Sequence, residues 1–113
     1  MMSVTEDAAA KIAARLQELW RTSKPQILER MAVLHSSCEG LAENSANAGA
    51  RSSGLEAAHK LSGVLGVFGL PQGSEIASSI EFLLKPGELL TADDLATLRM
   101  SVAELDAMIA AKG

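Results

Sequence analysis

Apolar residues recur along most of this chain at spacings of three and four, which is the period of an amphipathic helix. Two seams show the pattern most clearly: Ile27, Met31, Leu34, Cys38 and Leu41, and later Leu95, Leu98, Val102, Leu105 and Ile109. The alternation of apolar and polar residues that marks a half-buried strand appears nowhere in the sequence. The pattern therefore predicts an all-α protein.

Capping and helix-breaking residues divide the first half of the pattern into two helices and a loop. A capping box formed by Ser3 and Glu6 predicts a first helix from about residue 5 to residue 22. The stretch Ser23-Lys24-Pro25 predicts the start of a second helix, with the proline in the first turn, where an N–H group is not needed. The polar stretch from Glu43 to Gly54 predicts the longest connection, because Asn, Ser and Gly favour loops.

Three further helices are predicted behind that loop. One carries the stretch Ala57–Leu70, the next ends at Lys85-Pro86-Gly87, and the last begins near Thr91. Amphipathic helices joined by short loops bury their apolar faces most simply as an up-and-down four-helix bundle, here with an additional N-terminal helix. Because the chain has 113 residues, we expect a single domain over residues 1–113.

Composition and charge narrow the possible partners. The formal net charge is −4, the basic residues are scattered, and there are only one Trp, two Phe and no Tyr, so neither a basic patch nor a stacking platform for nucleic acid is expected. No apolar run approaches the roughly 20 residues that span a bilayer, and the N-terminus lacks the pattern of a signal peptide. We therefore expect a cytoplasmic monomer with no membrane partner.

The stretch Ala57–Leu70, AAHKLSGVLGVFGL, combines a histidine with three glycines in a predicted helix. On a helical wheel the apolar residues lie opposite His59: Ala58, Leu61, Val64, Leu65 and Phe68. Gly63 and Gly66 share the face of the histidine, although each glycine inside a helix costs about 1 kcal/mol. We therefore predict an exposed imidazole on a face that is kept free of large side chains for an outside partner.

The same stretch, followed by PQGSEIASSIEFLL, resembles the signature of the histidine-containing phosphotransfer (Hpt) domain of phosphorelays. The matching positions are Ala58, His59, Leu61, Gly63, Gly66, Phe68, Gly69 and Leu70, with Ile80 and Glu81 in the following helix. The resemblance implies a four-helix bundle in which His59 accepts a phosphoryl group from the aspartyl-phosphate of one receiver domain and passes it to another. It makes the chain a phosphocarrier, not an enzyme in its own right.

The resemblance also implies roles for residues around the histidine. Lys60 matches a lysine that offsets phosphoryl charge, Ser62 stands where many members carry a second lysine, and Glu81 matches a polar residue that holds the imidazole ring. Gly63 and Gly66 would leave room for the receiver. The partners would be the receiver domains of a hybrid histidine kinase and of a response regulator. This chain would bind no cofactor, whereas Mg²⁺ would sit in the receiver. With no room for an attached kinase or receiver, we expect a free-standing shuttle.

Three other interpretations compete with this one. A dimerisation helix of a histidine kinase usually has an acidic residue after its histidine, where this chain has Lys60. His35 and Cys38 have helical spacing for a metal or thiol site, but Cys38 falls in an apolar seam, so we predict that it is a core residue beside a surface histidine and expect no metal site. A helical adaptor that binds a partner without being phosphorylated stays open, and it predicts that His59→Gln keeps function.

Overall fold

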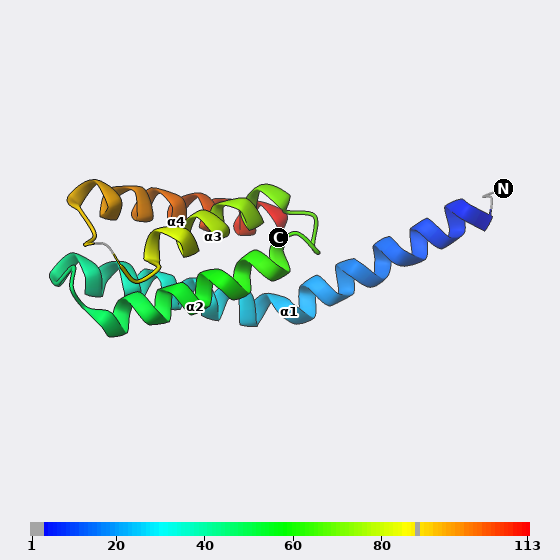
Figure 1. Cartoon of the computed structure of the whole chain (residues 1–113). Coiled ribbons are helices and arrows are strands. Elements are labelled where there is room, and N and C mark those ends of the chain that lie inside the picture. The colour runs from blue at the N-terminus through cyan, green and yellow to red at the C-terminus, as the bar shows by residue number, and fades with distance from the viewer. Residues whose placement is uncertain (1–3, 88) are drawn as a thin grey trace.

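The computed structural model describes residues 4–87 and 89–113 and contains four helices over that part of the chain (Figure 1). They are α1 (Val4–Glu43), α2 (Ala48–Leu65), α3 (Pro71–Leu84) and α4 (Ala92–Lys112). No strand occurs among these residues, so the all-α prediction is confirmed. Ser3, to which we assigned half of a capping box, lies outside the described residues.

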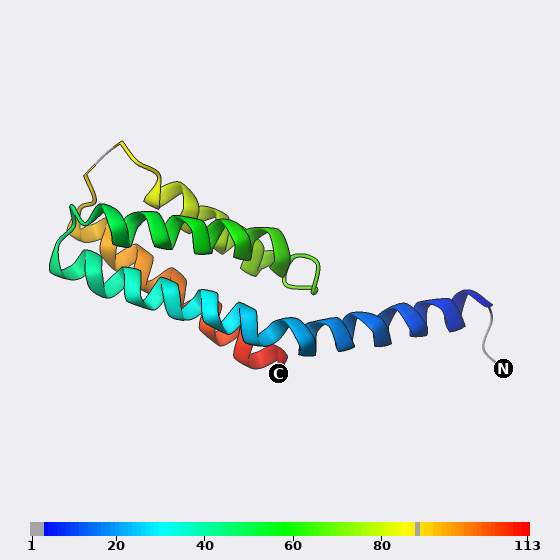
Figure 2. The ribbon, with the colours of Figure 1, turned by 90° about the horizontal axis from the view of Figure 1, so that it is seen from below.

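The helices form an up-and-down bundle in which each packs against its neighbours along the chain. Contacts join α1 to α2, α2 to α3, α3 to α4, and α4 back to α1. Within the described ranges α2 therefore lies diagonally across from α4, an arrangement that can be followed by comparing Figures 1 and 2. The core consists of one buried apolar face from each helix, and the fully buried large residues include Leu34, Leu61, Ile80 and Leu105. The seams predicted from periodicity are the ones that fill this core.

The prediction of a separate N-terminal helix is wrong, because residues 4–43 form one continuous helix. Pro25 lies inside α1 and does not end it. A proline in a helix interior removes one hydrogen bond and costs about 3 kcal/mol or more. Trp20 and Ile27, on either side of it, are both buried in the same core. Since this packing needs both segments on one axis, the tertiary contacts override the local breaking signal.

The first part of α1 extends beyond the end of the bundle and gives the molecule its elongated shape (Figure 1). The principal extents are 61 × 20 × 20 Å. Residues 5–19 are all exposed, and they include the apolar side chains of Ile12, Leu16 and Leu19. Within the segment that we predicted as a leading helix, residues 5–19 are therefore helical but lie outside the core, which α1 first enters at Trp20.

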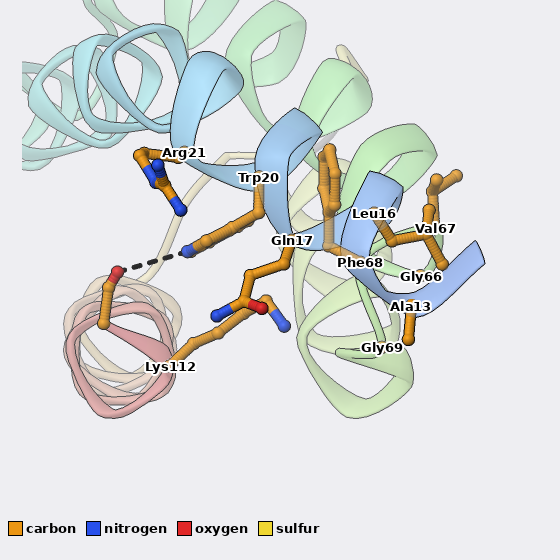
Figure 3. A pocket seen from close by; sticks show the side chains of 11 residues that line it. Ala13, Leu16, Gln17, Trp20, Arg21, Gly66, Val67, Phe68, Gly69 and Lys112 are labelled. Carbon is orange, nitrogen blue, oxygen red and sulfur yellow. Dashed lines mark hydrogen bonds between the residues drawn. The ribbon is translucent and has the colours of Figure 1, made fainter. Parts of the chain in front are cut away.

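Trp20 marks the point where α1 enters the bundle. Its ring packs edge-on against Phe68, with 5.3 Å between the ring centroids, and its Nε1 donates a hydrogen bond of 3.2 Å to the carbonyl oxygen of Gly113 (Figure 3). The Lys112 ammonium lies 5.2 Å from the ring centroid. Beside this cluster is an open pocket of about 720 Å³ between α1 and the turn after α2. These contacts join the C-terminus and the α2–α3 turn to α1.

The predicted loop from Glu43 to Gly54 is also wrong in extent, because only residues 44–47 connect α1 to α2. Asn47 caps α2, and its side-chain oxygen accepts a hydrogen bond of 3.0 Å from the backbone N–H of Ala50. Gly54 is buried where α2 crosses its neighbours. A Cβ atom at Gly54 would lie 2.9 Å from both Leu84 Cδ1 and Ser37 Oγ. At Gly54 the glycine therefore reflects close helix packing and not a loop.

None of the helices in the described part of the chain is both long enough and apolar enough to cross a membrane.

Candidate functional site

His59 lies in the fourth turn of α2, on the face opposite to the core. Its side chain is 74% exposed. Ala58, Leu61 and Leu65, which the helical wheel placed behind it, are fully buried. Phe68 is also buried, but from the turn that follows α2 and not from the helix itself. The predicted orientation of His59 is therefore confirmed. It could be predicted because the helical period alone fixes which side of an amphipathic helix faces water.

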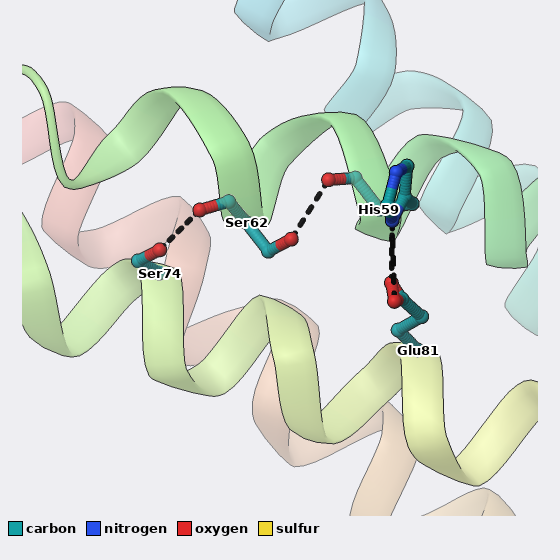
Figure 4. Close-up of polar contacts among 4 residues, drawn as sticks. All are labelled: His59, Ser62, Ser74 and Glu81. Atoms are coloured by element: carbon teal, nitrogen blue, oxygen red, sulfur yellow. Dashed lines mark hydrogen bonds and ion pairs between the residues drawn. The ribbon is translucent and has the colours of Figure 1, made fainter.

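The His59 imidazole is held from the neighbouring helix by Glu81. His59 Nδ1 lies 2.8 Å from Glu81 Oε2 and 3.2 Å from Glu81 Oε1 (Figure 4). Because a carboxylate accepts hydrogen bonds, this contact favours the tautomer that carries its proton on Nδ1. The Glu81 side chain is only 21% exposed, so it is the more fixed of the two partners. Nε2 is then the nitrogen with a lone pair, on an exposed ring.

The three glycines of this stretch occupy three different structural environments. Our expectation that Gly66 lies inside the helix is wrong. Helix α2 ends at Leu65, and Gly66 is its C-cap, so its helix-propensity cost does not apply. Gly69 has a φ of 77°, a left-handed conformation that ends the turn and suits glycine. Gly63 alone is an interior helical glycine, and a Cβ atom added there would meet no atom within 4 Å. The face beside His59 is therefore open at Gly63.

Ser62 supports the backbone next to the histidine and does not contact the imidazole. Its Oγ donates a hydrogen bond of 2.7 Å to the carbonyl oxygen of His59. The carbonyl oxygen of Ser62 accepts a hydrogen bond from Ser74 Oγ on α3 (Figure 4). Ser74 also lies under Gly66, whose added Cβ atom would be 3.8 Å from the Ser74 side chain. The Ser74–Ser62 bond and the His59–Glu81 contact join α2 to α3.

Lys60 does not lie against the imidazole in this structure. Its Nζ is 2.9 Å from Glu56 Oε1, one turn earlier on α2. The hydrogen bond and positive charge of Lys60 hold the pKa of the Glu56 carboxyl below its ordinary value. Both side chains are largely exposed, so the pair contributes little to stability. Lys60 can therefore exchange Glu56 for another anionic partner at little cost.

The predicted arrangement of the other candidate pair, a buried cysteine beside a surface histidine, is confirmed. Cys38 lies in the core, and burial raises the pKa of its thiol. His35 is 53% exposed, and its Nε2 lies 2.7 Å from Asp106 Oδ2 on α4. The two side chains thus have different surroundings. Over residues 4–87 and 89–113, no group of three or more His, Cys, Asp or Glu side chains has an arrangement that could hold a metal ion.

Two residues of this site were not anticipated from the sequence. Glu56 had a detectable signal, because Glu and Lys at positions i and i+4 commonly pair on a helix. Ser74 had none, since its bond to the backbone of Ser62 depends on how α3 lies against α2.

Comparison with known proteins identifies the family. The model of the Hpt domain matches residues 15–111. The chain is also 33% identical over 87 residues to Protein RcaC of Microchaete diplosiphon. That match covers 77% of this chain but only 13% of the length of RcaC. No solved structure matches the chain significantly.

The family match covers nearly the whole bundle and leaves out most of the protruding part of α1 and the last two residues. The matched range contains His59 and Glu81. Hpt domains are phosphocarrier modules that interact with receiver domains, and they do not act as enzymes. This chain therefore belongs to the Hpt domain family, whose members serve in histidine phosphotransfer in two-component signalling.

Proposed function

We propose that His59 Nε2 accepts a phosphoryl group from the aspartyl-phosphate of one receiver domain and passes it to the aspartate of another. The observation that carries this proposal is the combination of an exposed imidazole with a carboxylate bound to its Nδ1. With its proton held on Nδ1, the ring presents the lone pair of Nε2 to a partner. Gly63, with open space where a side chain would be, leaves that approach unobstructed.

The transfer needs no proton movement on this chain. The Nε2 lone pair forms the new bond to phosphorus while the bond from phosphorus to the aspartate oxygen breaks, and the aspartate leaves as a carboxylate. His59 then carries a phosphorylated ring with a proton on Nδ1 and a positive charge, which the Glu81 carboxylate offsets. The reverse sequence delivers the phosphoryl group to the second receiver. Phosphoryl transfer of this kind depends mainly on positioning and charge neutralisation.

The charge on the phosphoryl oxygens would be shared between the two proteins. We assign Mg²⁺ and the catalytic carboxylates to the receiver, and only the nucleophile and its positioning carboxylate to this chain. Lys60 is the nearest cation in sequence, and it would have to leave Glu56 to reach the phosphoryl group. Because this ion pair is exposed, its release costs little.

The test is phosphotransfer from a panel of phosphorylated receiver domains of the source organism. We expect at least one receiver to label the protein, with a label that is labile in acid, stable in alkali and mapped to the peptide that contains His59. If receivers bind but none labels the protein, the adaptor hypothesis takes the place of this one.

Glu81 provides a more specific prediction about how the ring is held. Glu81→Ala removes the acceptor on Nδ1 and the charge that offsets the phosphorylated ring. A charged hydrogen bond on a ring as exposed as His59 is worth about 1 kcal/mol after solvent screening, which is roughly a fivefold slower transfer. Glu81→Gln, which keeps an oxygen acceptor without the charge, is expected to fall between. Transfer rates of the two variants from one receiver check this, and equal rates for Glu81→Ala and native protein would contradict it.

A further inference from the structure

Phe82 is a large aromatic side chain on the outside of α3, and the fold gives it no packing role. It is 78% exposed. The other two aromatic residues of the chain, Trp20 and Phe68, are buried and pack against each other. Ile80 and Leu84, its neighbours in the helix, are also buried and lie on the opposite side of α3. The bundle therefore gains little by having an aromatic residue at this position.

Phe82 is next in sequence to the residue that binds the imidazole. Glu81 reaches across from α3 to His59 Nδ1. Adjacent Cα atoms are about 3.8 Å apart, and packed helices have axes about 8–10 Å apart. Phe82 thus lies at the level of His59 along the bundle, on the adjacent helix. Its side chain is rotated about the axis of α3 by about 100° from that of Glu81, toward solvent.

This position falls within the area that a protein phosphodonor must cover. A stable protein interface buries about 800 Å² on each partner, which corresponds to a disc with a radius of roughly 16 Å. Since the reacting phosphoryl group must reach His59 Nε2, such a disc is centred near the imidazole. Phe82, on the adjacent helix at the same level, lies inside it.

We propose that Phe82 is an anchor by which the receiver domain docks on the α2–α3 face. This inference rests on the proposed function. The occupant is a receiver because the surface is continuous with the histidine that receives its phosphoryl group. Aromatic side chains are enriched at interfaces, and a few of them carry most of the binding energy. Phe82 would enter an apolar depression on the receiver and so help orient the aspartyl-phosphate over His59.

The test uses the full chain, Phe82→Ala, and the control Met100→Ala. Met100 is 66% exposed and lies on α4, the helix diagonal to α2. Met100→Ala therefore removes an exposed apolar side chain that is far from His59. With a phosphorylated receiver as donor, we expect Phe82→Ala to raise KM by about tenfold or more at nearly unchanged kcat. Met100→Ala is expected to behave as native, and Phe82→Leu to recover part of the loss.

A small donor separates docking from chemistry. Phosphoramidate has no docking surface, so we expect it to label native protein and Phe82→Ala at equal rates on His59. If Phe82→Ala accepts the phosphoryl group from the receiver with native KM, the anchor is wrong while the proposed function stands. If it is slowed equally with both donors, Phe82 affects the imidazole and not docking, which also overturns the inference. If no receiver labels even native protein, the proposed function itself fails.

Discussion

Replacing His59 with glutamine is expected to reduce receiver-dependent phosphorylation to background while leaving the fold and receiver binding intact. Glutamine has a side chain of similar reach but no ring nitrogen that can attack phosphorus. The His59 side chain is 74% exposed and bonds to Glu81 on the surface, so the core loses nothing. The measurement is labelling by the receiver that phosphorylates the native protein, with receiver binding measured in parallel.

His35→Gln is the matched control for this variant. His35 is the second histidine of the chain, and it is also exposed and paired with a carboxylate, that of Asp106. In His35, however, Nε2 is the nitrogen that contacts the carboxylate, whereas in His59 it is Nδ1. We expect His35→Gln to be labelled as native. Label that persists in His59→Gln and disappears in His35→Gln would move the acceptor to the α1–α4 face.

The second large effect concerns stability. Gly54→Val is expected to destabilise the bundle by about 2 kcal/mol, because over-packing a helix contact typically costs 1–3 kcal/mol. The first added atom would already lie 2.9 Å from Leu84 Cδ1 on α3 and from Ser37 Oγ on α1. For a domain of this size the midpoint of thermal unfolding should fall by about 8 °C. Thermal and urea unfolding followed by circular dichroism measure both quantities.

Gly63→Val is the control for this variant, because it makes the same substitution in the same helix. No atom lies within 4 Å of an added Cβ atom at Gly63. Valine is a slightly better helix former than glycine, so we expect stability to change by less than about 0.5 kcal/mol, in the stabilising direction. Equal losses at Gly54 and Gly63 would contradict this expectation, because the loss at Gly54 would then not come from the close packing of α2 against α1 and α3.

The structure also shows why boundary signals failed at two places. Pro25 and the Asn-, Ser- and Gly-rich stretch before Gly54 are local breaking signals, yet both fall within or beside helices. In each case the outcome depends on packing with distant residues. Trp20 contacts Phe68 and Gly113, and Gly54 faces Ser37 and Leu84. These contacts join residues that are far apart in the sequence, so a pattern of neighbouring residues cannot predict them.

The sequence by itself determined which faces of the helices are buried and that His59 points away from them, because helical periodicity is a property of neighbouring residues. The motif around His59 was also enough to predict the family. Only the tertiary structure decided that α1 is one helix, that Gly54 is a contact point, and that Ser74 on α3 bonds to the backbone of Ser62 on α2. These outcomes depend on distances between side chains and on competition among partners, and both are set when the helices pack.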